Sequence, residues 1–303
     1  MKHDFLAAVA VAMRDPGLAG LRPVVEKEIL HYDILFALER EKLLNDIVFQ
    51  GGTSLRLIHA APRFSEDLDF VGGLDFTPAK LMKIRDCVMD HIGTRYGLQI
   101  AIKEPKEMRR DPLYYGIAVD RWQISVTTSP EQKDMPRQKI KLEVANVPAH
   151  TRELRSPRRN YAHIPDGYDD IMIPVETIDE ILADKVVSLV ACTTHPRHRD
   201  IWDLQWLRQR NARLIPELVV AKIADYRIED YRGKLDSRIE GLPDLVASQT
   251  FRSEMSRFVA PDVRARTFDK PGFTEFLARE VAAILIEARS EIFETRHDAE
   301  FAL

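Results

Sequence analysis

The stretch from Ile47 to Val71 constrains the fold most, because it sets a pair of glycines between two short apolar runs. The first run has the β-branched and aromatic residues that strands favour. Gly51 and Gly52 follow, a helix is expected from Thr53 to Ala61, and Phe64 to Val71 alternates as a second strand. The stretch therefore predicts a strand, a glycine turn, a helix and a second strand.

Two aspartates, Asp67 and Asp69, lie two residues apart in the expected second strand, so their carboxylates point to the same face. Adjacent carboxylates repel one another unless a cation shares them, and Mg²⁺ takes hard oxygen ligands while keeping substrate phosphates in its shell. The glycines let backbone N–H groups approach a phosphate, and the N-terminal end of the following helix favours an anion. The pattern predicts a site for a nucleoside triphosphate (NTP) and a metal.

The segments GGTSLR at 51–56 and RFSEDLDF at 63–70 resemble the signature of the AbiEii/AbiGii toxin family. That family belongs to the nucleotidyltransferase superfamily, which includes DNA polymerase beta and the CCA-adding enzymes. The superfamily pattern is Gly-Gly or Gly-Ser, a spacer, then Asp-x-Asp or Asp-x-Glu, and this chain has Thr53 and Ser54 in place of a single serine. The alternative interpretation is a glycine turn followed by two solvated aspartates. The resemblance implies a set of nucleotide-binding residues: Gly51, Gly52, Thr53, Ser54, Arg63 and Ser65.

Composition indicates an ordinary globular protein, with 45% hydrophobic and 30% charged residues among 303. The sequence has no run of 18 apolar residues and no signal-peptide pattern, so we expect a cytoplasmic protein without a membrane partner. The net charge of −4 argues against non-specific coating of nucleic acid. Cys87 and Cys192 are expected to be free, buried thiols.

A third carboxylate is expected from Glu143, in a strand predicted over Lys139 to Val147. Alternation along this strand places Glu143 on the polar face with Lys139 and Lys141. The nucleotidyltransferase resemblance implies such a carboxylate beside the aspartate pair. The alternative is a half-exposed strand glutamate paired with a lysine.

Lys185 lies on the apolar stripe of a helix that opens with the capping box Thr177-x-x-Glu180. A lysine on a face destined for burial needs an anionic partner, because an unpaired buried ammonium is costly. The segment 183–187 looks like the family's lysine-bearing helix, and the resemblance implies contact with the nucleotide phosphates. The alternative is a lysine that extends to solvent at the edge of the stripe.

The segment 199–204, which reads RDIWDL, resembles the family's closing motif. Asp200 and Asp203 are three apart and share a helix face. They can orient Lys185, polarise an attacking hydroxyl, or cap the helix and pair with arginines. The sequence does not separate the two, and the resemblance implies that at least one acts in the site.

We expect an α/β nucleotidyltransferase core resembling DNA polymerase beta over residues 1–165 and a mainly helical lobe over 166–303, with the active site in the cleft between them. Further strands are predicted at about 98–102 and 116–127, a helix from Thr77 to Tyr96, and a loop over 148–176. Two basic clusters are candidate contacts for a nucleic-acid backbone: Arg152, Arg155, Arg158 and Arg159, and Arg227, Arg232, Lys234 and Arg238.

The resemblance implies transfer of a nucleoside monophosphate from an NTP to an RNA acceptor, the tRNA 3′ end, which blocks translation. Asp67, Asp69 and Glu143 would hold two Mg²⁺ ions, and Lys185 would neutralise charge on the phosphates. A cognate antitoxin protein would be the partner. The alternatives are nucleotidylation of a protein or small-molecule hydroxyl, and a catalytically silent module that binds nucleotide or antitoxin.

Overall fold

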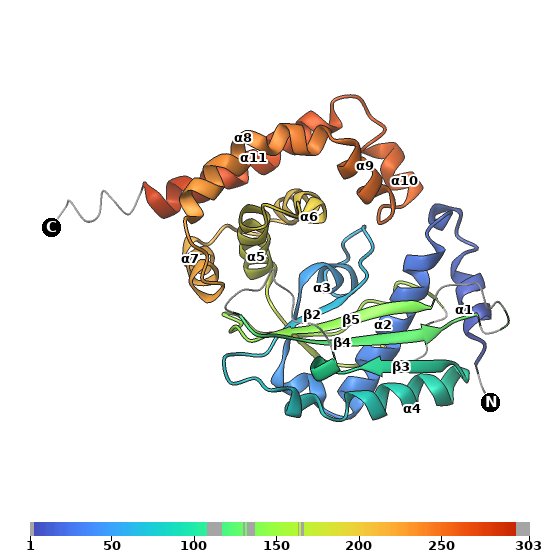
Figure 1. The fold of residues 1–303 in the computed structure, drawn as a ribbon. Helices are drawn as coiled ribbons and strands as arrows, with labels where there is room; N and C mark the ends of the chain where they lie inside the picture. The colour runs from blue at the N-terminus through green and yellow to red at the C-terminus, as the bar shows by residue number, and fades with distance from the viewer. Residues whose placement is uncertain are drawn as a thin grey trace. The chain divides into compact units, whose positions relative to one another are not determined.

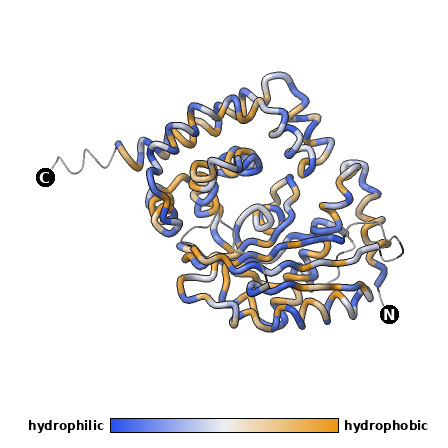
Figure 2. Tube along the Cα trace, in the orientation of Figure 1, coloured by the Kyte–Doolittle hydropathy of each residue, from blue (hydrophilic) through white to orange (hydrophobic). Residues whose placement is uncertain are grey.

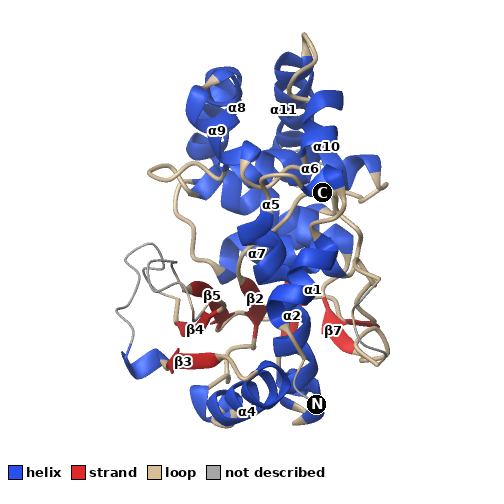
Figure 3. Cartoon of the chain, turned by 90° about the vertical axis from the view of Figure 1, so that its right-hand side faces the viewer, coloured by secondary structure: helices blue, strands red, loops and turns tan. Residues whose placement is uncertain are grey.

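The computed structural model forms two compact units, Met1–Glu176 and Thr177–Leu303. Within the described residues, strands occur only in the first unit, and the second is built from helices (Figure 3). This arrangement confirms the expected α/β class. The structure describes residues 3–107, 117–129, 131, 137–162, 164 and 167–294.

A seven-stranded mixed sheet forms the first unit, in the order β3-β4-β5-β2-β1-β7-β6 (Figure 1). Neighbouring strands are antiparallel except for β2 with β5 and β1 with β7, which are parallel. The side chains of Phe49, Phe70, Trp122 and Leu142 are buried, so the middle of the sheet belongs to the core. The strands are β1 (Val48–Gln50), β2 (Leu68–Val71), β3 (Gln99–Lys103), β4 (Val119–Thr127), β5 (Gln138–Ala145), β6 (Glu153–Arg155) and β7 (Ile173–Val175).

Helices of the first unit pack on this sheet. Helix α2 contacts α4 and β5, α4 contacts β3, and α3 contacts β1 and β2. Pro23 lies in the first turn of α2, where its missing N–H costs no helical hydrogen bond. The elements are α1 (Phe5–Ala12), α2 (Arg22–Arg40), α3 (Gly51–Leu57) and α4 (Ile84–Tyr96), with 3₁₀ turns η1 (Pro16–Leu18), η2 (Leu43–Asp46), η3 (Pro78–Leu81) and η4 (Pro105–Glu107).

The bounds predicted for the second strand were wrong. Strand β2 begins at Leu68 rather than Phe64, so Asp67 lies just before the strand. Backbone carbonyls ahead of it accept hydrogen bonds from side chains: Arg63 donates to Phe64 O at 2.8 Å, and Thr53 donates to Asp67 O. These bonds replace a strand ladder in that segment.

The bounds of the helix after the glycines also differ from the prediction. Helix α3 begins at Gly51 and ends at Leu57, and Ala60 adopts a left-handed conformation with φ 65°. The Arg56 guanidinium donates to Ala61 O at 3.2 Å, which satisfies a carbonyl beyond the helix end. The predicted extension to Ala61 was therefore wrong, because the chain turns back at Ala60 and the Ala61 N–H donates to the Leu55 carbonyl at 2.9 Å, which closes the helix end.

Three further expectations need correction. The helix expected from Thr77 divides into η3 and α4, because its first turn forms i→i+3 bonds such as Lys80 N–H to Thr77 O. The expected loop 148–176 contains β6 and β7, whose three residues each are too few to show a strand period. Cys87 and Cys192 are free but half-buried rather than buried. The expected strand start at residue 116 lies outside the described residues.

The helical unit begins at the predicted capping box, where the Glu180 N–H donates to Thr177 Oγ1 at 3.3 Å. Hydrophobic and hydrophilic residues alternate along α8 and α11, as expected for helices that bury one face (Figure 2). The elements are α5 (Ile178–Ala191), α6 (His198–Gln209), α7 (Pro216–Asp225), α8 (Tyr231–Ala247), α9 (Gln249–Ser256), α10 (Pro261–Arg266) and α11 (Phe273–Phe293). Among the described residues, none of the helices has the length and apolar character needed to cross a bilayer.

A buried histidine holds the segment that leads into β2. His31 of α2 is fully buried, and its Nε2 lies 3.0 Å from Glu66 O, so Nε2–H donates and Nδ1 is unprotonated. Burial lowers the pKa of His31 to about 4. The unfolded chain therefore binds a proton more readily than the folded chain between pH 6.5 and 4, and stability falls as pH drops through that window.

We expect the free energy of unfolding to fall by about 2 kcal/mol more in the wild type than in His31→Gln when the pH drops from about 7 to about 5. Glutamine keeps a donor for Glu66 O but takes up no proton. Urea unfolding followed by circular dichroism at both pH values measures the difference. If the free energy of unfolding depended on pH equally in the two proteins, this result would contradict the lowered pKa of His31.

Candidate active site

The glycine turn brings the backbone against the second aspartate of the pair. Gly51 has φ 74°, and a Cβ added to it would lie 3.0 Å from Asp69 Oδ2. Gln50 and Asp69 are register partners in the β1–β2 ladder. Both the left-handed backbone and the close approach require glycine at position 51.

The second glycine makes room for Arg63 and Ser65. A Cβ on Gly52 would lie 2.6 Å from Arg63 Nη2 and 3.0 Å from Ser65 Oγ. Arg63 is only 2% exposed. A guanidinium and a hydroxyl gathered at a glycine turn are donors suited to a phosphate. The structure thus brings together four of the residues expected to bind nucleotide.

Thr53 and Ser54, which were also expected to bind nucleotide, are buried as well. Thr53 is 1% exposed and donates to the Asp67 carbonyl, which fixes the approach to β2. Ser54 is fully buried, and within the described part of the chain its Oγ has no hydrogen-bond partner. A contact between either residue and a nucleotide stays a prediction.

The β2–β5 register pairs the second aspartate with the third carboxylate. Asp69 lies opposite Glu143 in this parallel ladder. Nearby, the Lys141 N–H donates to Asp67 Oδ1 at 3.0 Å, and Lys141 Nζ lies 4.0 Å from Asp67 Oδ2. Asp69 and Glu143 therefore lie at paired positions of β2 and β5, and Asp67 lies just before β2.

Arg121 is a partner that the sequence did not reveal. Its Nε lies 2.6 Å from Glu143 Oε1, and both side chains are largely buried. Arg121 and Glu143 are register partners in the antiparallel β4–β5 ladder. Alternation along β4 identifies its polar face, but only the strand register shows that Arg121, rather than a lysine, faces Glu143.

Lys185 has the anionic partners that its place on the apolar stripe required. Its Nζ lies 2.5 Å from Asp200 Oδ1 and 3.1 Å from Asp203 Oδ2. Ser188, one turn further along α5, donates to Asp200 Oδ2 at 2.6 Å. Asp200 and Asp203 thus hold the lysine in place within the helical unit, and their part in a reaction stays a prediction.

The electrostatics of Asp200 follow from this network. Burial alone would raise the pKa of Asp200, but the Lys185 ammonium and the charge of Arg197 outweigh it and lower the pKa below its usual range. Asp200 is therefore ionised at neutral pH and supplies a negative charge beside the Lys185 side chain.

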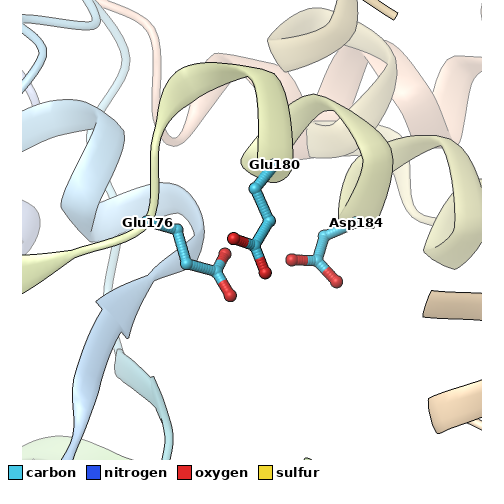
Figure 4. Close-up of side chains that lie close together, drawn as sticks. All are labelled: Glu176, Glu180 and Asp184. Atoms are coloured by element: carbon cyan, nitrogen blue, oxygen red, sulfur yellow. The ribbon is translucent and has the colours of Figure 1, made fainter. Parts of the chain in front are cut away.

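A second group of acids lies where the first unit ends and α5 begins. The carboxylates of Glu176, Glu180 and Asp184 lie within 4.8 Å of one another and are buried (Figure 4). Lys222 of α7, fully buried, places Nζ 2.6 Å from Glu180 Oε1 and 3.0 Å from Asp184 Oδ2. The lysine ammonium thus supplies positive charge at this cluster, so the donor set does not call for a metal ion.

The expected basic clusters take part in the fold. Arg155 pairs with Glu153 at 2.6 Å, and Arg159 pairs with Asp169 at 2.9 Å. In the helical unit, Arg238 donates to Cys192 O at 2.8 Å. Binding of nucleic acid by these clusters stays a prediction.

The chemistry of the donors fits a divalent ion at the aspartate pair. Asp67, Asp69 and Glu143 offer carboxylate oxygens of the hard type that Mg²⁺ prefers. The space at Gly51, which a Cβ would fill, leaves one carboxylate oxygen of Asp69 beside the backbone. Such a group of carboxylates beside a cationic glycine turn can hold a metal–triphosphate complex.

Comparison with known families identifies the class of protein. The family model described as nucleotidyl transferase AbiEii toxin, type IV toxin–antitoxin system, matches residues 33–289. The chain belongs to this family. It is an AbiEii-type nucleotidyltransferase, and the resemblance seen in the two motif segments is confirmed.

A solved structure has a similar fold. The AbiEii-type chain is similar to MenT4, a nucleotidyltransferase toxin from Mycobacterium tuberculosis, with a TM-score of 0.57 and 17% identity over 96% of this chain and 99% of MenT4. JHP933 from Helicobacter pylori matches 92% of this chain and 97% of its own, at 18% identity and a TM-score of 0.46. The search of curated proteins found no match.

Proposed function

We propose that this AbiEii-type enzyme is a cytoplasmic toxin that transfers a nucleoside monophosphate from an NTP to the 3′ end of tRNA, in a Mg²⁺-dependent reaction that blocks translation. A cognate antitoxin would restrain it. The observation that carries the proposal is the pairing of Asp69 with Glu143 in the β2–β5 ladder beside Gly51, with Asp67 just before β2.

The reaction is a displacement at the α-phosphorus of the NTP. The acceptor hydroxyl oxygen forms a bond to this phosphorus, the bond to the β-phosphate bridging oxygen breaks, and pyrophosphate leaves with the electron pair. The hydroxyl proton passes to a carboxylate of the site, for which Glu143 is the candidate, or to solvent. Mg²⁺, when bound, supplies positive charge to the triphosphate and lowers the pKa of the attacking hydroxyl.

The protein's own residues position the substrate. Asp67, Asp69 and Glu143 would hold Mg²⁺, and Arg63 and Ser65 at the Gly52 backbone would bind phosphate oxygens. Lys185, held in place by Asp200 and Asp203, would neutralise further charge on the triphosphate.

The test is incubation of the protein with each labelled NTP, total RNA, total protein and Mg²⁺. We expect label in the tRNA band and loss of label when Mg²⁺ is chelated. Label in protein or in a small hydroxylated molecule such as an aminoglycoside would favour those acceptors instead. Absence of label in every fraction would favour a silent binding module.

Lys185→Met should slow transfer or weaken NTP binding by more than about tenfold, because a positive charge toward the phosphates is lost. It should also lower the free energy of unfolding by about 3 kcal/mol, since Asp200 and Asp203 lose their buried counter-charge. Lys185→Met with Asp200→Asn removes one charge of each sign. We expect this double variant to regain stability but not transfer.

Titration with NTP, initial rates and urea unfolding separate the two roles of Lys185. Near wild-type transfer in the stabilised double variant would show that Lys185 is a structural partner of the aspartates alone.

A further inference from the structure

A cavity of about 300 Å³ lies in the helical unit, lined by residues of α9, of α10 and of the segment that follows α10. Gln249, Arg252, Ser253 and Ser256 line one wall, and their spacing of three and four residues places them on one face of α9. Arg264 of α10 lines the cavity as well. The cavity therefore gathers two guanidinium groups, two hydroxyls and an amide.

The two arginines of this α9–α10 cavity differ from their neighbours in how they are partnered. Within the described part of the chain, neither Arg252 nor Arg264 forms an ion pair, and the buried Nε of Arg264 has no hydrogen-bond partner. Arg252 donates to the Phe268 carbonyl at 3.3 Å. By contrast, Arg266, two residues from Arg264, pairs with Asp262 at 2.7 Å.

The charges that face the cavity favour an anion of low charge. Asp269 is the acidic residue among those lining it, against two arginines. Hydroxyl and amide groups beside a guanidinium can donate to phosphate oxygens, and the planar arginine fork matches two such oxygens. A cavity of this size is at the lower limit for small-molecule pockets, so it suits a phosphate with its sugar better than a whole NTP.

We propose that the α9–α10 cavity binds a backbone phosphate of the acceptor RNA. The inference rests on the proposed transfer to RNA and adds a substrate contact to it. Arg252 and Ser253 are exposed, so a polymer strand can reach them. Neither expected basic cluster contains Arg252 or Arg264, so this contact is separate from both.

The test compares three variants of the full chain. Arg252→Gln with Arg264→Gln removes both cavity charges. Ser253→Asp adds a carboxylate at an exposed position without removing an arginine. Arg266→Gln is the matched control, because Arg266 is 70% exposed, lies on α10 and does not line the cavity.

Binding of labelled tRNA is measured on filters over a series of salt concentrations, and NTP binding and transfer are measured in parallel. We expect the double variant to raise the Kd for tRNA by at least about tenfold. The slope of log K against log salt should become shallower by about 0.7–0.9 for one phosphate contact. Ser253→Asp should shift binding in the same direction, Arg266→Gln should match the wild type, and NTP affinity should be unchanged in all three.

Weakened NTP binding with unchanged tRNA binding in the cavity variants would assign the cavity to free nucleotide and overturn the proposal. Wild-type tRNA affinity and salt slope in both cavity variants would also overturn it. If the wild-type protein labels no RNA, that result contradicts the proposed function rather than the cavity inference. The cavity inference is then tested by the tRNA-binding comparison alone.

Discussion

Nucleotide transfer is expected to be abolished when Asp67 and Asp69 are both replaced by Asn, and to fall by more than about 100-fold for either single change. Asparagine keeps the shape of the side chain but removes the charge that attracts Mg²⁺. In Asp67→Asn the new amide oxygen can still accept the hydrogen bond that the Lys141 N–H gives to Asp67 in the wild type. Loss of activity in this variant would therefore result from the lost charge rather than from a change in the fold.

Stability provides an independent readout of the aspartate pair. Without divalent ions, the free energy of unfolding of the double variant should equal or exceed that of the wild type, because repulsion between like charges is relieved. Asp75→Asn is the matched control, since Asp75 is an exposed aspartate a few residues after β2. Titration with Mg²⁺ by calorimetry should show loss of binding in the double variant alone. A double variant that still transfers nucleotide would contradict the proposed role of Asp67 and Asp69 in holding Mg²⁺.

Local periodicity was enough to predict the parts of the site that lie within one element. The capping box at Thr177 and the shared face of Asp200 and Asp203 follow from a helical period, and the structure shows both. Lys185 was expected to have an anionic partner because burying an unpaired ammonium costs free energy. These inferences hold because neighbours in one element have fixed spacing whatever the rest of the chain does.

Several contacts between elements were not predictable from the sequence. Arg121 meets Glu143 because of the β4–β5 register, and Arg63 fills the space beside Gly52 because the segment before β2 is a loop. Lys222 comes to Glu180 through packing of α7 on α5. A one-residue shift in register or helix rotation would change each partner, and a single sequence does not specify either.

Lys222→Met is expected to lower the free energy of unfolding of the helical unit by about 3–5 kcal/mol. The wild-type ammonium is fully buried between Glu180 and Asp184, so its removal leaves two buried carboxylates without that counter-charge. Trp202 and Trp206 lie on α6 of the same unit, and their fluorescence during urea unfolding follows it. Lys270→Met, a change at an exposed lysine of the same unit, is the control and should have little effect.

Neutralising the acids should compensate for the loss of the lysine. Glu180→Gln and Asp184→Asn, combined with Lys222→Met, remove the ammonium together with the two carboxylates that contact it, and the triple variant should recover most of the stability lost in the single variant. Addition of millimolar Mg²⁺ distinguishes an ion pair from a metal centre. If Lys222 supplies the counter-charge, Mg²⁺ should not stabilise the wild-type helical unit. A large stabilisation of the wild-type helical unit that persists in Asp67→Asn/Asp69→Asn would instead assign a metal to Glu176, Glu180 and Asp184.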